Sequence, residues 1–212
     1  MLFWVYNLLS GGYIRKKLFV YGMETNMKEY YRIKVAGVER DLKLFPVNDK
    51  LSIAAFILFG DVELTVACAG ELARIAPEHD ILLTAEAKSI PLIHEMARQL
   101  GENEYIVARK GPKVYMEDIV TISVNSITTQ HEQKLCIGKK EADLMRSKRV
   151  LIVDDVISTG ESLAALEKLV EAVGGNIVGK LAVLAEGDAI DREDITVLAP
   201  LPLFDASGEP LA

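Results

Sequence analysis

We predict an α/β fold for this chain of 212 residues, with a mainly parallel central sheet and helices on both of its faces. Strand-like and helix-like segments alternate along the chain, which is typical of parallel sheets whose strands are joined by helices. The strand-like segments include aliphatic runs, as expected for strands that are buried on both faces. No internal repeat or linker-like tract divides the sequence, which favours a single domain.

In the first half of the chain, apolar and polar residues alternate over 30–47 and predict one or two strands before a turn at residues 45–50. Apolar residues at helical spacing over 62–77 predict a helix that stops at Pro77. Three further elements follow: a short buried strand and polar turn over 80–89, a helix over 90–101 and a strand over 104–109.

The second half contains the clearest strand of the sequence, the aliphatic run KRVLIVDD over 148–155. A Ser/Thr/Gly turn follows it, and then a helix that we expect over 161–173, because a pair of glycines comes directly afterwards. Further strands are predicted over 176–186 and 194–199. Before these elements, residues 110–133 are rich in Gly, Pro, charged and hydroxyl residues, which predicts a mobile segment that could pair as a hairpin.

The composition disfavours a nucleic-acid-binding protein. The chain has 24 Lys and Arg against 31 Asp and Glu, and its formal charge of -7 raises the electrostatic cost of approaching a phosphate backbone. Cys68 and Cys136 are far apart and stand in no metal-ligand spacing with the three histidines. Such thiols are typical of a reducing compartment, so we expect a cytoplasmic protein without nucleic-acid or membrane partners.

The first 26 residues differ from the rest of the chain. The apolar stretch from Leu2 to Leu9 falls well short of the roughly 20 residues that span a bilayer. A secretory signal would place basic residues before such a run, whereas here they follow it at 15–17. We expect residues 1–26 to be a loose extension, or the product of a start site placed too early, and residues 27–212 to form one domain.

Residues 150–162, VLIVDDVISTGES, predict a site for a sugar phosphate. The strand delivers Asp154 and Asp155 to its carboxyl end, where ligands bind in parallel sheets. Hydroxyl groups and amides at the start of the next helix can surround a phosphate, and the helix dipole favours its negative charge. Two adjacent carboxylates can accept hydrogen bonds from vicinal ribose hydroxyls and hold a hydrated Mg²⁺ nearby.

This series of strand, acidic pair, short apolar step, Thr-Gly and helix resembles the signature of type I phosphoribosyltransferases, and the purine (adenine and xanthine) enzymes most of all. The resemblance implies that fold, with a small hood formed by about residues 27–60 and the C-terminal segment. It implies that Asp154 and Asp155 are catalytic and hold Mg²⁺ through water. The residues that it implies for the 5′-phosphate are Val156, Ile157, Ser158, Thr159, Gly160, Glu161 and Ser162.

Receiver domains of two-component systems also carry the letters VLIVDD, and they are the alternative for this motif. They carry it near their start, however, and roughly a hundred residues of fold must follow. Fewer residues than that follow Asp154 in this chain. The position of the motif therefore favours the phosphoribosyltransferase interpretation.

A second resemblance concerns pyrophosphate. The turn over 86–89 and the following helix resemble the family's pyrophosphate loop, and a basic group follows the next strand. A diphosphate needs backbone amides and cations together, which this pairing provides. The implied pyrophosphate residues are Glu86, Ala87, Lys88, Ser89, Arg109, Lys110 and Lys113. In this family such a basic group also reaches across a dimer interface, which implies a homodimer.

The base site is expected beneath the hood. Residues 45–63 resemble the hood segment of adenine and xanthine enzymes, and Phe45 or Ile53 could sandwich a flat base with Val156. Phe45 and Ile53 are equally compatible with positions in the core. Glu186, which follows the strand after the phosphate helix, resembles the acid at the strand end of adenine enzymes.

Two departures leave the base and the general acid open. Adenine enzymes carry a glutamate in their mobile loop, and the segment after Lys113 has no clear equivalent, although Glu117 and Asp118 lie near. Hypoxanthine-guanine enzymes have Asp where Ser158 stands here. The expected substrate is therefore a purine of the adenine or xanthine type.

The resemblance implies a pentosyl-transferring enzyme of purine salvage, which uses Mg²⁺ and joins a free base to 5-phosphoribosyl-1-pyrophosphate. The mobile segment after Lys113 would close over the reacting groups and exclude water. The alternative function is a regulator that binds the same activated sugar without catalysis, like the purine-operon repressors. Those proteins add a winged-helix module, for which the roughly 40 residues before the hood segment over 45–63 are too few.

Overall fold

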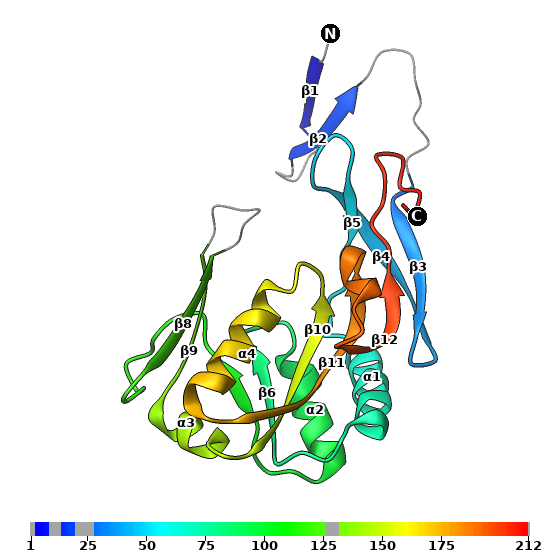
Figure 1. Cartoon of the computed structure of the whole chain (residues 1–212). Helices are drawn as coiled ribbons and strands as arrows, with labels where there is room; N and C mark the ends of the chain where they lie inside the picture. Colours follow the sequence, from blue (N-terminus) through cyan, green and yellow to red (C-terminus); the bar gives the residue numbers. More distant parts are fainter. Residues whose placement is uncertain (1–2, 9–13, 20–27, 126–131, 212) are drawn as a thin grey trace.

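The structure is a computed structural model that describes residues 3–8, 14–19, 28–125 and 132–211 (Figure 1). Within these residues the central sheet has five strands in the order β12-β11-β10-β6-β7, and all neighbouring pairs are parallel. The strands are β6 (Ile81–Ala85), β7 (Ile106–Ala108), β10 (Arg149–Ile157), β11 (Asn176–Glu186) and β12 (Thr196–Leu201). The predicted parallel sheet is confirmed, and its central strand is the aliphatic run of the sequence.

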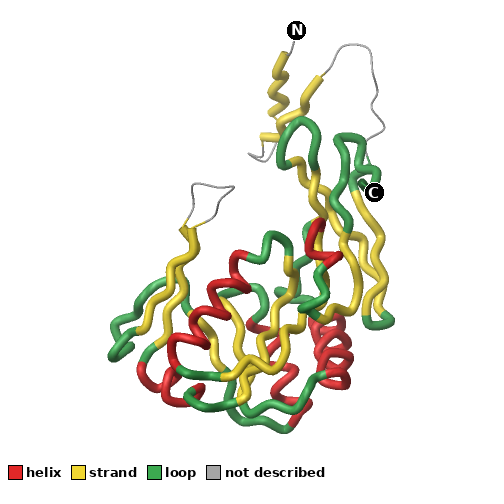
Figure 2. Tube along the Cα trace, viewed as in Figure 1, coloured by secondary structure: helices red, strands yellow, loops and turns green. Residues whose placement is uncertain are grey.

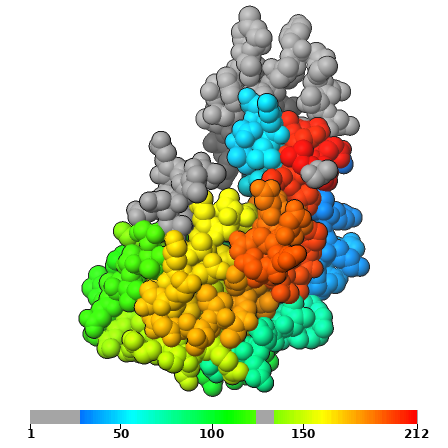
Figure 3. All heavy atoms as spheres, in the orientation of Figure 1, coloured from blue at the N-terminus to red at the C-terminus, as the bar shows by residue number. Residues whose placement is uncertain are grey.

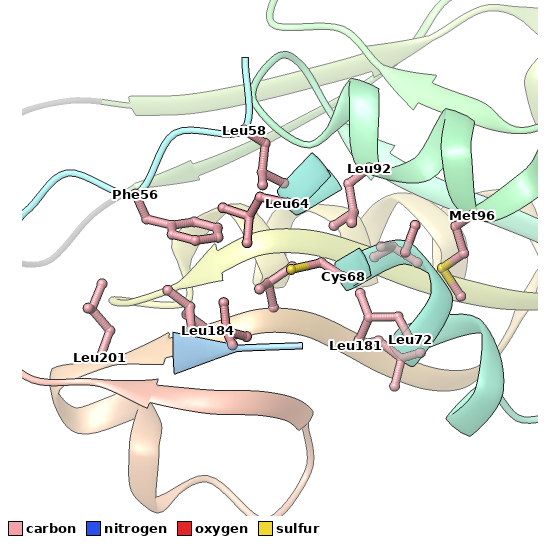
Figure 4. Packing of buried hydrophobic residues seen from close by; sticks show 14 of the residues in the cluster. Phe56, Leu58, Leu64, Cys68, Leu72, Leu92, Met96, Leu181, Leu184 and Leu201 are labelled. Carbon is pink, nitrogen blue, oxygen red and sulfur yellow. The ribbon is translucent and has the colours of Figure 1, made fainter. Parts of the chain in front are cut away.

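Helices cover both faces of this sheet, as predicted (Figure 1). They are α1 (Val62–Ile75) and α2 (Ile90–Leu100) on one face, and α3 (Lys139–Met145) and α4 (Glu161–Val173) on the other. Successive residues of β10 serve opposite faces, because Leu151 and Val153 pack with α1 and α2 whereas Val150 and Ile152 pack with α3 and α4. Figure 4 shows the first of these clusters, where side chains of α1, α2 and β11 meet.

The helix ends agree with the local sequence. The carboxylate of Asp61 accepts a hydrogen bond from the Leu64 N–H at 3.1 Å and caps the start of α1. Helices α2 and α4 end at Gly101 and Gly174, which both adopt the left-handed conformation that glycine allows. Helix α4 has the predicted bounds residue for residue. Helix α3 was not predicted, because it is short and follows a segment that we expected to be mobile.

A second, antiparallel sheet packs against the core that α1 and α2 share with the central sheet, and it extends past the carboxyl ends of the central strands (Figures 1 and 2). It consists of β3 (Tyr30–Val35), β4 (Val38–Pro46) and β5 (Ser52–Ala54). The C-terminal segment joins this sheet, because Phe204 bridges to Ser52 and its buried ring lies 4.9 Å from that of Tyr31. These are the residues expected to form the hood.

Two hairpins complete the described structure. Strands β8 (Val120–Asn125) and β9 (Glu132–Ile137) pair antiparallel. A hairpin is therefore present, but its second strand runs to Ile137, past the end expected at residue 133. Residues 126–131 lie outside the described residues. Strands β1 (Phe3–Leu8) and β2 (Ile14–Phe19) also pair antiparallel. The rest of the N-terminal segment, where we expected a loose extension, lies outside the described residues.

The described helices include none that is both long and apolar enough to cross a bilayer.

A short 3-10 helix, η1 (Gly187–Asp191), connects β11 to β12. It was not predicted from the sequence, and it places Arg192 beside Gly160 at the start of α4.

Candidate active site

Asp154 and Asp155 lie where β10 leaves its neighbour β6. The two strands pair only as far as Ile152 and Leu83, and the start of α2 occupies the place beyond that point. Asp155 is buried, with 3% of its surface exposed, and Asp154 is half-buried. The end of the central strand therefore carries two adjacent carboxyl groups with little access to solvent.

Ser89, the residue before α2, holds both carboxyl groups. Its Oγ lies 2.5 Å from Oδ1 of Asp154 and 3.0 Å from Oδ1 of Asp155, and it accepts a hydrogen bond from the Asp155 N–H at 2.9 Å. The hydroxyl has one hydrogen, so it can donate to only one carboxylate at a time. Burial, and then the neighbouring Asp155 carboxylate, raise the pKa of Asp154.

Lys88 approaches the same pair from the solvent side. Its Nζ lies 3.0 Å from Oδ2 of Asp155, and its side chain is 53% exposed. Glu186, at the end of β11, is half-buried, and this burial raises its pKa while the charge of Lys88 partly opposes the shift. The ends of β10 and β11 and the turn before α2 thus bring three carboxyl groups and one lysine together.

The turn between β10 and α4 forms a small concave cradle. A cavity of about 50 Å³ is lined by Asp154, Val156, Ile157, Ser158, Thr159, Gly160, Glu161, Ser162 and Leu163. All seven residues predicted for the 5′-phosphate are among them. Because the first amides of a helix have no intrahelical partner and carry the positive end of its dipole, this cradle suits a phosphate.

Arg192 is a residue of this region that the sequence did not predict. A Cβ atom at Gly160, whose φ is +76°, would lie 2.6 Å from Nη1 of Arg192. Asp194 holds the arginine through contacts of 2.9 and 2.7 Å, and Lys180 links Asp194 to Glu167 of α4. In the space-filling view the segment after β11, in orange, lies against the start of α4, in yellow (Figure 3).

The predicted pyrophosphate residues form two groups. Lys88 and Ser89 contact the acidic pair, whereas the basic residues after β7 gather around Glu86. Its carboxylate accepts a hydrogen bond from the Lys110 N–H at 3.0 Å and lies 3.3 Å from Nη2 of Arg109. The Lys110 amide, and then the charges of Arg109, Lys113 and Lys110, lower the pKa of Glu86 against the effect of burial. Ala87, between the two groups, is exposed.

The residues predicted for the base lie on two different sheets. Phe45 and Ile53 face each other across β4 and β5 of the hood, and Phe45 is 46% exposed with Nζ of Lys43 at 5.6 Å from its ring centre. They are therefore not core residues of the described structure. Val156 and Glu186 lie near the carboxyl ends of β10 and β11 in the central sheet.

Comparison with protein families identifies one match. A family described as "Phosphoribosyl transferase domain" matches residues 66–199, which span the central sheet and its helices but not the hood strands.

Curated relatives include an adenine phosphoribosyltransferase of Rhodococcus jostii, 30% identical over 60% of this chain and 69% of the relative. A xanthine phosphoribosyltransferase of Lactobacillus delbrueckii is 29% identical over 70% of this chain and 76% of the relative. A hypoxanthine/guanine phosphoribosyltransferase of Methanosarcina mazei is 36% identical over 51% of this chain and 53% of the relative. All three names describe transfer to a purine.

Solved structures with this fold include two adenine phosphoribosyltransferases. That of Thermoanaerobacter pseudethanolicus has a TM-score of 0.60 at 21% identity, over 75% of this chain and 95% of its own. That of Saccharomyces cerevisiae has a TM-score of 0.59 at 19% identity, over 81% of this chain and 92% of its own. At these identities the likeness concerns the fold, and the expected α/β architecture with a hood agrees with it.

Proposed function

Since the chain belongs to the phosphoribosyltransferase family and is one of its enzymes, we propose that it joins a free purine base to 5-phosphoribosyl-1-pyrophosphate. The products are a nucleoside monophosphate and pyrophosphate, and the reaction serves purine salvage. The observation that carries this proposal is the acidic pair of β10 directly beside the cradle at the start of α4.

The cradle is proposed to bind the 5′-phosphate. Ser158 and Thr159 are exposed and bring hydroxyl groups to its rim, and Gly160 brings the backbone close to the ligand. With the phosphate in this cradle, the ribose would extend toward Asp154, which also lines the cavity. Asp154 and Asp155 would then accept hydrogen bonds from the ribose hydroxyls.

The acidic pair also fits Mg²⁺. Oδ2 of Asp155 is buried and makes no well-directed hydrogen bond, although Nζ of Lys88 is close by. Among the described residues no cluster of three or more His, Cys, Asp or Glu is arranged to hold a metal. Mg²⁺ commonly binds one or two carboxylates and completes its shell with water and substrate phosphates. When bound with the substrate, it would neutralise charge on the departing pyrophosphate.

The reaction breaks the bond from C1 of the ribose to an oxygen of pyrophosphate and forms a bond from C1 to a nitrogen of the base, which releases one proton to solvent. Positive charge develops on the ribose as pyrophosphate leaves, and the nearby carboxylates of Asp154 and Asp155 stabilise it. Lys88, with the basic group around Glu86, supplies cations for the leaving pyrophosphate. The main contribution of the protein is to position the reacting groups.

The base is proposed to lie between the carboxyl ends of β10 and β11 and the hood. Val156 offers an apolar surface, Glu186 a half-buried carboxyl group, and Phe45 an exposed aromatic ring on the hood sheet, with Ile53 opposite it. The names of the relatives cover adenine, xanthine and hypoxanthine/guanine. Because Ser158 stands where hypoxanthine-guanine enzymes carry Asp, we propose a purine of the adenine or xanthine type.

We further propose a cytoplasmic homodimer. The two cysteines, Cys68 and Cys136, are buried and unpaired, which suits a reducing compartment. An exposed apolar group at residues 57–66, formed by Ile57, Phe59, Val62 and Val66, suits contact with a second copy.

The test is turnover of adenine, guanine, hypoxanthine, xanthine and uracil with the activated sugar and Mg²⁺. We expect base-dependent release of pyrophosphate with adenine or xanthine. Binding of the activated sugar in calorimetry without turnover of any base, together with a shift of DNA in a gel assay, would instead support the regulator.

A further inference from the structure

Lys88 occupies a particular position beside the acidic pair. Its Nζ lies 3.0 Å from Oδ2 of Asp155, a carboxylate with 3% of its surface exposed. Lys88 is the only basic side chain paired with Asp155 in the described part of the chain. A positive charge therefore already lies beside the most buried carboxylate of the site.

The other oxygen of Asp155 is engaged differently. Oδ1 faces the hydroxyl of Ser89 at 3.0 Å, and Ser89 is almost fully buried. Oδ2 has no directed hydrogen bond and depends on the lysine for its neutralisation. Because the lysine side chain is about half exposed, it can leave Oδ2 at much lower cost than the buried serine could leave Oδ1.

We propose that Lys88 holds, in the metal-free protein, the place beside Asp155 that a divalent cation takes when it binds. The cation and the lysine ammonium group then compete for one carboxylate oxygen, and the cation must displace Nζ. This inference rests on the proposed function only in taking Asp155 as a metal-binding residue.

The displacement has a consequence for the leaving group. Lys88 belongs to the turn over 86–89, the segment proposed to bind pyrophosphate. An ammonium group released from Asp155 stays on this turn and becomes available to the pyrophosphate. The exchange therefore makes the ammonium group of Lys88 available to the leaving group only when the metal is bound.

The experiment measures binding of Mn²⁺ ions to the protein without substrate, by the electron paramagnetic resonance signal of free Mn²⁺. Lys88→Met removes the competing charge and should tighten Mn²⁺ binding about fivefold or more, the order expected for loss of a partly exposed ion pair. Lys88→Arg keeps a cation in place and should bind Mn²⁺ about as weakly as the unchanged protein. The same comparison in an Asp155→Asn background separates Mn²⁺ binding at this site from binding elsewhere. In that background Lys88→Met should no longer change the affinity for Mn²⁺.

The matched control is Lys110→Met, which removes a lysine near Glu86 that makes no contact with Asp155. Equal Mn²⁺ tightening by Lys110→Met and Lys88→Met would overturn the proposal, since general electrostatics would then suffice. So would an unchanged affinity in Lys88→Met, or no Mn²⁺ binding by any variant. Failure of the proposed function is a separate result, namely no turnover of any base by the unchanged protein.

Discussion

The hydroxyl of Ser89 lies 2.5 Å from Oδ1 of Asp154, so a hydrogen bond connects the residue directly before α2 to the end of β10. The same hydroxyl accepts a hydrogen bond from the Asp155 N–H and lies near the carboxylate of that residue. The turn proposed for pyrophosphate and the acids proposed for the ribose are thereby held in one fixed arrangement. Changes at this point should affect turnover more than stability.

Ser89→Ala removes the hydroxyl and leaves buried carboxylate oxygens with fewer donors. We expect kcat to fall about tenfold or more, with a smaller change in KM for the activated sugar, because positioning of the acids is lost. The measurement is steady-state kinetics together with urea unfolding. The control is Ser207→Ala, which removes an exposed serine that also donates to a carboxylate, that of Asp205 at 2.7 Å. Equal kinetics of the two variants would exclude a positioning role for Ser89.

The double change Asp154→Asn with Asp155→Asn keeps the shape of both side chains and removes their charge. Turnover should fall at least about a hundredfold, because the developing charge on the ribose loses its stabilisation. Circular dichroism should show that the fold is intact. Near-normal turnover would remove these residues from the mechanism.

Gly160→Ala tests the contact between the cradle and Arg192. The new Cβ would lie 2.6 Å from Nη1 of Arg192, so the turn or the arginine must shift, and KM for the activated sugar should rise about tenfold. Gly174→Ala is the matched control, because its φ is also positive at +77° but a Cβ there meets nothing within 4 Å.

Both alanine variants should lose about 1–2 kcal/mol of stability from the left-handed backbone alone. Only Gly160→Ala should change KM. A similar KM in the two variants would show that the cradle tolerates displacement of Arg192.

Asp80 provides a test of pH dependence away from the site. Its pKa is lowered to about 2, first by the side chain of Arg149 and then by that residue's amide. Because the folded pKa lies below the unfolded value of about 3.9, the carboxylate stabilises the fold above that value, and the contribution is lost as the pH falls through about 2.

The measurement for Asp80 is urea unfolding of the unchanged protein and of Asp80→Asn at several pH values. Their difference in free energy of unfolding should be constant above about pH 4 and shrink between about pH 4 and 2. Glu71→Gln, which affects an exposed pair within α1, serves as the control. A difference for Asp80→Asn that persists unchanged at the lowest pH would contradict the prediction.

Much of the fold followed from local patterns. The run over 148–155 places aliphatic side chains on both faces of its strand because helices cover both faces of the sheet. An aliphatic run of this kind by itself indicates the central strand of a parallel sheet. The bounds of α4 could be predicted because glycine at the end of a helix acts within one turn of chain. The cradle residues 156–162 are contiguous, so their proximity needed no tertiary information.

Contacts between distant segments could not be predicted in this way. Ser89 and Asp154 are 65 residues apart, and they meet only because β6 pairs beside β10 and ends before it. Arg192 lies in a charged stretch that is typical of an exposed loop, and only η1 carries it over Gly160. The sequence by itself determined the strand, the acids and the phosphate turn, because these depend on neighbouring residues. The tertiary structure decided what holds them in place, because strand order and packing are properties of the whole chain.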